Sequence, residues 1–206
     1  MFSQALQRSY TLLAPLYDGF VAAPTRVVRQ HSLAQLDNVQ DMNILLCGIG
    51  TGLDIPYLPD GACYTGIDLT YAMLKRAKRR ITTQNISLHQ GNVMQLPYPD
   101  EYFDVVIMHF ILAVVPFPQI ALDEATRVLK PHSNILILDK FLRPKQRAPV
   151  RRLLSPVISK IATRTDVVFE NLEHPTLTVV SDIPVLMGGW FRQILLRRDK
   201  ENYKDS

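Results

Sequence analysis

The sequence predicts an α/β protein built on a doubly wound, mostly parallel β-sheet. Strand-like apolar runs alternate with helical patterns between residues 43 and 141, and parallel strands need crossover connections of the length that these helices supply. Three glycines within five positions follow the first apolar run, where a sheet of this kind places its ligand-binding turn. A chain of 206 residues with 47% hydrophobic residues is long enough to bury one core.

Each expected element follows from a local pattern. Short apolar runs are expected to form strands at 43–47, 63–68, 86–91, 103–110 and 134–141. Helical spacing covers 71–80 and 118–130, a further helix is expected to start after the glycines, and 4–36 is expected to be helical with breaks at Pro15 and Pro24. The end of the chain differs, because 177–181 and 190–198 flank two adjacent glycines and are expected to be strands joined by a loop.

The cytoplasm, with a possible peripheral place on the inner membrane surface, is the expected compartment. No apolar stretch reaches the roughly 20 residues that a membrane-spanning helix needs, and the longest, 105–117, contains His109. The first 20 residues have no clear cleavage site, so we do not interpret them as a signal peptide. Cys47 and Cys63 are expected at opposite ends of two parallel strands, which makes a disulfide between them incompatible with the predicted sheet.

The positive charge is concentrated in one segment. The net charge is +4, yet the range 140–164 alone holds eight basic residues and no acidic one. An anionic partner is therefore expected to meet the chain there.

The glycine cluster by itself does not identify a ligand. In G-I-G-T-G-L, Leu53 stands where a dinucleotide-binding turn has its third glycine, and no Gly-Lys-Ser/Thr follows as in a P-loop. Asp68 is more informative, because it ends the second expected strand, 18 residues after Gly50. A carboxylate there can accept hydrogen bonds from both hydroxyls of a ribose. The alternative is that Asp68 or Thr70 caps the helix 71–80.

Four stretches in order resemble the motif series of class I S-adenosylmethionine-dependent methyltransferases. They are "NILLCGIGTG", "YTGIDLTYAML", "QGNVMQLPYPDEYFDVVIM" and "EATRVLKPHSNILILD", and the match runs from about residue 10 to 141. The resemblance implies a Rossmann-like seven-stranded sheet, mostly parallel with a C-terminal antiparallel strand, and helices on both faces. It implies one methyltransferase domain over 1–206, with a helical cap (1–40), a cofactor-binding core (41–141) and a basic amphipathic segment with the last two strands (142–206).

The resemblance also implies a cofactor and its contacts. The cofactor is S-adenosyl-L-methionine, with its ribose on Asp68 and its methionine part above Gly48, Gly50 and Gly52. The implied adenine contacts are Leu69, Met73, the side-chain oxygen of Asn92 and the backbone of Val93. Two positions depart from the family pattern: Asn92 replaces the usual Asp, and Leu46 replaces an acidic residue that often contacts the methionine amino group.

Three further residues are candidates for catalysis or cofactor contact. His109 ends the fourth expected strand at the ligand edge of the sheet, so it is a candidate general base and cofactor contact, or else a packed histidine. Tyr10 and Tyr17 in "YTLLAPLYD" match the N-terminal stretch of the branch that resembles ubiquinone/menaquinone C-methyltransferases and bacterial phosphatidylethanolamine N-methyltransferases. That resemblance makes Tyr10 a catalytic candidate and Tyr17 a cofactor contact, whereas the alternative is that both only pack a helix on the sheet.

The basic segment bears on the substrate. In 149–164 the apolar residues form one helical stripe, with Arg151, Arg152, Lys160 and Arg164 on the other face. Such a helix either packs its stripe on the core or lies on an anionic membrane, so peripheral membrane contact through 143–164 is one expectation.

These observations give a ranked set of functions. The first is methylation of a lipid-like acceptor, with the amine of phosphatidylethanolamine slightly preferred to a quinone-type ring. A soluble metabolite is the next alternative, RNA ranks lower because no aromatic-interleaved platform is present, and a non-catalytic cofactor-binding subunit ranks last. No metal site is expected, since the five histidines lie in separate elements.

Overall fold

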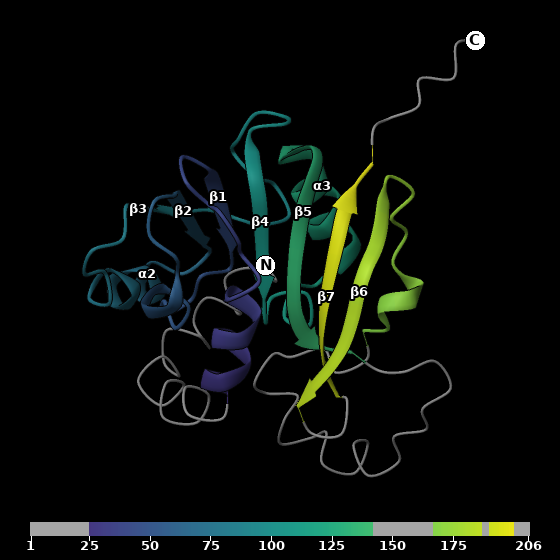
Figure 1. The fold of residues 1–206 in the computed structure, drawn as a ribbon, viewed down its shortest axis with the longest axis horizontal. Coiled ribbons are helices and arrows are strands. Elements are labelled where there is room, and N and C mark those ends of the chain that lie inside the picture. Colours follow the sequence, from purple (N-terminus) through teal and green to yellow (C-terminus); the bar gives the residue numbers. More distant parts are fainter. Residues whose placement is uncertain (1–24, 142–166, 187–189, 200–206) are drawn as a thin grey trace.

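The chain folds into a seven-stranded sheet with helices on both faces (Figure 1). The computed structural model describes residues 25–141, 167–186 and 190–199. The sheet order is β3-β2-β1-β4-β5-β7-β6. The strands are β1 (Asn43–Cys47), β2 (Cys63–Asp68), β3 (Ile86–Gln90), β4 (Phe103–His109), β5 (Leu129–Lys140), β6 (Leu177–Leu186) and β7 (Phe191–Arg198).

The strand directions confirm the predicted fold class. The pairs β1–β2, β1–β4, β2–β3 and β4–β5 are parallel, and β7 is antiparallel to both β5 and β6. The carboxyl ends of β1, β2 and β4 therefore meet at one edge of the sheet. In the register of β1 and β2, Asn43 lies opposite Cys63 and Cys47 opposite Ile67, so the two cysteines lie at opposite ends, as expected.

Three element boundaries differ from the prediction. The segment after the glycines forms only the short 3-10 helix η1 (Ile55–Tyr57), and Pro59 cannot extend it because proline has no backbone N–H to donate. Strand β5 begins at Leu129, directly after α3 (Pro118–Val128), because Leu129 pairs with Phe103 before a register shift. Strand β6 continues to Leu186 along β7.

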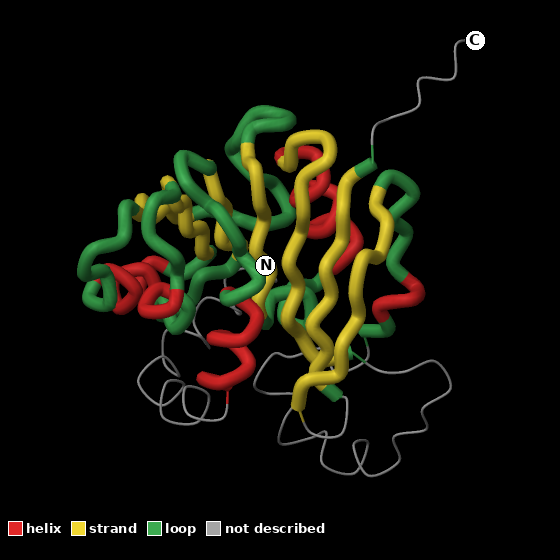
Figure 2. Tube along the Cα trace, viewed as in Figure 1, coloured by secondary structure: helices red, strands yellow, loops and turns green. Residues whose placement is uncertain are grey.

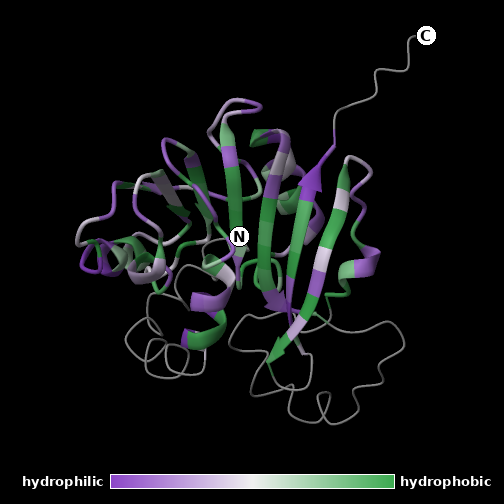
Figure 3. Cartoon of the chain, viewed as in Figure 1, coloured by the Kyte–Doolittle hydropathy of each residue, from purple (hydrophilic) through white to green (hydrophobic). Residues whose placement is uncertain are grey.

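Each face of the sheet buries its own apolar cluster. Alternate residues of β4 point to opposite faces: Val106 and Met108 lie in one cluster, Val105 and Ile107 in the other. The first cluster includes the apolar side of α3, and the second includes α2 (Tyr71–Lys78) and Leu33 of the helix at 25–33. Figure 2 shows these helices on the two sides of the sheet, and Figure 3 shows the hydrophobic colour concentrated in the central strands.

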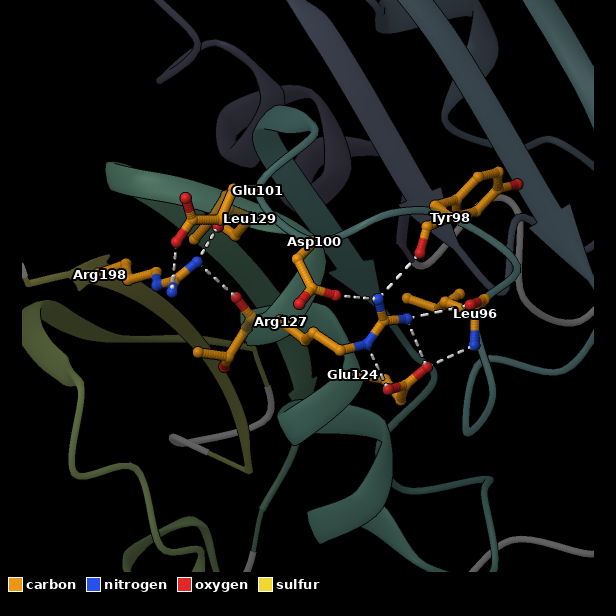
Figure 4. Close-up of polar contacts among 9 residues, drawn as sticks. Leu96, Tyr98, Asp100, Glu101, Glu124, Arg127, Leu129 and Arg198 are labelled. Atoms are coloured by element: carbon orange, nitrogen blue, oxygen red, sulfur yellow. Dashed lines mark hydrogen bonds and ion pairs between the residues drawn. The ribbon is translucent and has the colours of Figure 1, made fainter. Parts of the chain in front are cut away.

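Arg127 ties together two segments that the sequence analysis singled out. It lies in α3, within "RVLKP", and its guanidinium donates to the backbone oxygens of Leu96 (3.0 Å) and Tyr98 (2.9 Å), in the loop "LPYPDEYFD" (Figure 4). It also forms ion pairs with Asp100 (2.7 Å) and Glu124 (2.8 Å). The hydrogen bonds from Arg127 lower the pKa of Glu124. One planar side chain therefore fixes the loop that leads into β4.

A second arginine, Arg198 of β7, makes contacts at the amino edge of β4 and β5. Arg198 donates to the backbone oxygens of Leu129 and Thr126, and it forms an ion pair with Glu101 at 3.0 Å (Figure 4). These contacts join the end of β7 to α3 and the start of β5. The amino ends of β4 and β5 are thus held by polar contacts, which leaves the carboxyl ends for a ligand.

Several sequence predictions lie outside the described residues. They concern Tyr10, Tyr17, the amphipathic segment 143–164 and the adjacent glycines at 188–189, and they stay predictions, as does the division of the chain into cap, core and C-terminal part. In the described ranges, no helix is both long enough and apolar enough to cross a membrane.

Replacing Arg127 is expected to destabilise the fold. Arg127→Ala leaves two partly buried carbonyl oxygens without their donors, so the free energy of unfolding should fall by about 1–3 kcal/mol. Arg127→Lys should recover only part of this loss, because an ammonium group lacks the planar fork. Urea denaturation measures both, with Arg79→Ala on the exposed end of α2 as the control. Equal stability of the Arg127→Ala and Arg79→Ala variants would contradict the assigned role.

Candidate active site

A cavity opens at the carboxyl ends of β1, β2 and β4. Its lining comes from the glycine loop, the start of α2, the loop after β3 and the segment after β4. The lining residues are Gly48, Gly50, Asp68, Leu69, Thr70, Met73, Asn92, Val93, Met94, Phe110, Ile111, Val114, Val115 and Pro116. Most of these side chains are apolar, and Asp68 is the one ionisable side chain among them. This is the location where a doubly wound sheet binds its ligand.

The three glycines of the loop serve different purposes. All three have left-handed φ angles, of 67°, 56° and 78° for Gly48, Gly50 and Gly52. A Cβ on Gly48 would collide with Ile111, and one on Gly52 would lie 2.9 Å from the Cα of Ala77 in α2. A Cβ on Gly50 would have no atom nearer than 3.9 Å. Gly50 therefore offers its backbone to open space, whereas Gly52 lies against α2 and does not line the cavity.

Asp68 holds the loop and the start of α2 together. The N–H of Gly50 donates to its Oδ2 (2.9 Å), and the N–H of Thr70 donates to its Oδ1 (2.8 Å). Burial raises the pKa of Asp68, and these two hydrogen bonds partly offset the rise. A carboxylate has about four lone-pair directions, so each oxygen can still accept one hydroxyl. This arrangement fits a ribose diol at the cavity.

The predicted adenine contacts come together on one side of the cavity. Leu69 lies just before α2, Met73 lies in the first turn of α2, and Val93 follows β3. The three apolar side chains therefore come from segments that follow two adjacent strands, β2 and β3. The side-chain oxygen of Asn92 accepts from the N–H of Met94 at 3.0 Å. The oxygen expected to meet the adenine amine is therefore already fixed in a turn, with one lone pair left.

Leu46 is not among the lining residues. Its side chain is buried in the cluster with Ile44 and Ile107. Among the described residues that line the cavity, none supplies a second carboxylate in its place.

The segment after β4 forms the opposite wall. Phe110 has a left-handed φ of 57°, which is uncommon for an aromatic residue, and its N–H donates to the oxygen of Leu138 at 2.7 Å. The buried carboxylate of Asp139, at the end of β5, accepts from the N–H of Ala113 at 3.0 Å. Burial raises the pKa of Asp139 to about 6. These contacts from β5 hold the wall in place.

His109 lies next to the cavity but does not line it. Its Nε2 is 3.0 Å from Ser32 Oγ, and its Nδ1 is 3.1 Å from Asp54 Oδ1. Asp54 also forms an ion pair with Arg29 at 2.7 Å. Burial acts to raise the pKa of Asp54, but the charges of Arg29 and His109 outweigh it, so the pKa lies below its usual value. The network joins the helix at 25–33 to the glycine loop and β4.

Ser32, His109 and Asp54 are hydrogen-bonded in the same order as the Ser, His and Asp of a nucleophilic triad. Their surroundings differ from those of such a triad. All three side chains are buried, with Ser32 at 0% exposed, so no substrate reaches the hydroxyl. The charge of Asp54 is balanced by Arg29 rather than reserved for an imidazolium. The network is therefore a structural one.

The sequence analysis did not single out Arg29, Ser32 or Asp54. One signal was available, since Thr25, Arg29 and Ser32 lie on one side of a helix at spacings of four and three residues. The structure shows the Thr25–Arg29 contact, in which Arg29 Nε donates to Thr25 Oγ1 at 3.1 Å. No described group of three or more His, Cys, Asp or Glu side chains is arranged to hold a metal ion.

Known proteins match this chain in sequence and in fold. A family model described as "Methyltransferase domain" matches residues 45–137. A phosphatidylethanolamine N-methyltransferase of Cereibacter sphaeroides is 30% identical over 200 residues, which cover 94% of this chain and 98% of that protein. A demethylmenaquinone methyltransferase of Lactiplantibacillus plantarum is 32% identical over 146 residues, which cover 65% of this chain and 62% of that protein.

Solved structures agree on the fold but not on one reaction. A methyltransferase of Aquifex aeolicus, described as SAM-dependent, superimposes with a TM-score of 0.61 at 18% identity, over 89% of this chain and 98% of that one. The [4+2]-cyclase SpnF superimposes with a TM-score of 0.75 at 17% identity, over 96% of both chains. The fold alone therefore does not fix the chemistry.

The sequence match over nearly the whole of a related enzyme does fix the class. The motif order, the sheet topology and the position of the Asp68 carboxylate agree with this match. All of them are consistent with a cavity for one cofactor, S-adenosyl-L-methionine. The chain belongs to the class I S-adenosylmethionine-dependent methyltransferases, in the branch of the phosphatidylethanolamine N-methyltransferases and demethylmenaquinone methyltransferases.

Proposed function

We propose that this methyltransferase transfers methyl groups to the amine of phosphatidylethanolamine. The observation that carries the proposal is the match to a phosphatidylethanolamine N-methyltransferase over 98% of that protein, whereas the demethylmenaquinone methyltransferase is matched over 62%. The concentration of basic residues in 140–164 supports contact with anionic lipid, so peripheral association with a membrane is part of the proposal.

Different cavity residues would bind different parts of the cofactor. Asp68 would accept hydrogen bonds from the ribose hydroxyls, and the open backbone at Gly50 would let the methionine part pass close to the loop. Leu69, Met73 and Val93 would enclose the adenine, with Asn92 at its amine. The carboxylate and the apolar surfaces together suit a nucleoside that carries no phosphate, because a phosphate would be repelled by Asp68.

The cofactor supplies a methyl group on a sulfonium, which is already a good leaving group. The residues of the chain then have to position the acceptor amine in line and keep water out. The amine must be uncharged when it attacks, so the ammonium has to lose a proton first. The predicted base, His109, does not line the cavity and has both ring nitrogens bonded to Ser32 and Asp54, so in this proposal it positions the glycine loop rather than accepting the proton. Tyr10 and Tyr17 remain predictions.

A quinone-type ring is the second candidate acceptor. It is favoured by the demethylmenaquinone methyltransferase, which is 32% identical over the part that it shares with this chain. The acceptor atom would then be a ring carbon rather than an amine, and no headgroup would need to be recognised.

The acceptor can be tested with vesicles of defined composition. With methyl-labelled S-adenosylmethionine, vesicles that contain phosphatidylethanolamine should yield labelled mono-, di- and trimethylated lipid. Vesicles of phosphatidylcholine with the same acyl chains are the control and should stay unlabelled, because a quaternary amine has no lone pair to attack. At low salt, added phosphatidylglycerol should raise the rate by recruiting the basic segment. Label only in vesicles that carry a demethylated quinone would reject the proposal in favour of the second candidate.

Asp68→Asn is expected to weaken cofactor binding. The amide keeps one acceptor but loses the charge and the second acceptor, so the Kd for S-adenosylhomocysteine should rise about 30-fold, as expected for the loss of about 2 kcal/mol. Asp68→Ala should raise it further. Isothermal titration measures the Kd, and Asp60→Asn, on an exposed loop at the other edge of the sheet, is the control. An unchanged Kd for Asp68→Ala would show that this carboxylate does not bind the cofactor.

Gly50→Ala and Gly52→Ala should affect different quantities, although both residues have left-handed φ angles. Each should lose about 1–2 kcal/mol of stability from the backbone, and only Gly52→Ala should lose a further 1–3 kcal/mol, because its new methyl group meets Ala77. Gly50→Ala should instead raise the Kd for S-adenosylhomocysteine at least tenfold. Urea denaturation and isothermal titration compare the pair. Equal stabilities, or full affinity in Gly50→Ala, would contradict this division of roles.

A further inference from the structure

One buried amide in the sheet has no hydrogen-bond partner among the residues that the structure describes. Gln193 lies in β7 with 1% of its surface exposed, and within the described ranges neither its Oε1 nor its Nε2 has a hydrogen-bond partner. Leaving such groups unsatisfied costs on the order of 1–3 kcal/mol each, and a leucine or methionine would avoid that cost at this position. A buried polar group of this kind calls for an explanation, such as an internal water or a bound ligand.

Gln193 lies on the face of the sheet that carries the buried histidine. In the sheet register Gln193 is opposite Leu138 of β5, and Leu138 is opposite His109 of β4. Side chains at paired positions of adjacent strands point to the same face. Strand β7 begins at the edge of the sheet where β4 and β5 end (Figure 1). Gln193 is the third residue of β7, so it lies close to this edge.

Aromatic rings connect this amide to the cavity. Phe191 is two residues from Gln193 in the same strand, so both side chains lie on one face. The ring of Phe191 is 5.9 Å from that of Phe110, which lines the cavity. The guanidinium of Arg29 lies over the ring of Phe110 at 4.4 Å. From the cavity towards β7, the side chains therefore follow in the order Phe110, Phe191 and Gln193.

We propose that Gln193 is a specificity-determining residue for the methyl acceptor, with its amide bound to a zwitterionic headgroup. Its Oε1 would accept from the ammonium or amine N–H, and its Nε2 would donate to a phosphodiester oxygen. Gln193 is covered in the structure and does not line the cavity, so the headgroup would reach its amide from the carboxyl edge of the sheet by displacing the half-buried rings of Phe110 and Phe191. This assignment rests on the proposed function and goes beyond it by naming the group that recognises the acceptor.

A neutral amide suits a headgroup that carries both charges. A carboxylate at this position would repel the phosphate, and an ammonium would repel the amine, whereas an amide offers one partner to each. Each methyl transfer replaces one N–H of the acceptor by a methyl group. The quaternary product has no N–H to donate to Oε1, so Gln193 should bind the product less well than the substrate and favour its release.

Binding measured without turnover tests this inference. Short-chain dihexanoyl phosphatidylethanolamine and dihexanoyl phosphatidylcholine are titrated separately into the full chain saturated with S-adenosylhomocysteine. The unchanged protein should prefer the ethanolamine lipid about tenfold, the effect of one hydrogen bond. Gln193→Met should reduce that preference to less than threefold, with the Kd for S-adenosylhomocysteine unchanged and the urea midpoint equal or higher. Gln40→Met, on an exposed loop at the opposite edge of the sheet, should keep the full preference.

The outcomes separate the inference from the function on which it rests. If Gln193→Met keeps the preference while its urea midpoint rises, the amide only holds an internal water and the inference is overturned. If that variant shows no cooperative unfolding, Gln193→Ala decides instead, because it removes both polar groups without adding volume and should also reduce the preference to less than threefold. A preference that stays near tenfold would overturn the inference. If the unchanged protein transfers no methyl group to phosphatidylethanolamine vesicles, the proposed function fails, and the inference falls with it.

Discussion

The site depends on one carboxylate that is shared by two stretches of backbone. Asp68 ends β2, yet it accepts from the N–H of Gly50 in the loop after β1 and from the N–H of Thr70 at the start of α2. The loop and the helix therefore hold their shape around the side chain that would bind the cofactor. Each carboxylate oxygen keeps one lone pair that would accept from a ribose hydroxyl with little reorganisation of the loop. Binding geometry and local folding are thus the same set of contacts, and a change in one is felt in the other.

Much of this framework could be predicted from the sequence, because it depends on local patterns. Strand positions, the parallel order, the left-handed loop and the carboxylate at the end of β2 all follow from periodicity, glycines and spacing. The network of Arg29, Ser32, Asp54 and His109 could not, since it joins three distant segments by polar side chains that have no shared period. Sequence also gave no means of telling apart the glycines, of which Gly52 faces a helix and Gly50 faces open space.

Arg127 shows why two unremarkable motifs are informative as a pair. One carries the arginine, and the other carries the carbonyl groups of Leu96 and Tyr98 and the carboxylate of Asp100 that the arginine binds. A guanidinium in this position needs several acceptors at fixed angles, so the loop sequence and the helix sequence constrain each other. That loop enters β4, and β4 leads to Phe110, which lines the cavity, and carries His109 beside it. A contact at the amino edge of the sheet therefore sets the position of groups at the carboxyl edge.

In the proposed function, different parts of the sheet would recognise the methyl donor and the acceptor. Donor contacts would come from the ends of β1, β2 and β3 and would consist largely of backbone, one carboxylate and apolar walls. Groups that differ in chemistry lie across β4, β5 and β7, where Phe110, Asp139 and Gln193 occur. A [4+2]-cyclase shares this fold at 17% identity, so the fold by itself does not determine the reaction. The proposed role of Gln193 would place the choice of acceptor in β7, because its amide is buried there with no hydrogen-bond partner among the described residues, which packing alone does not explain.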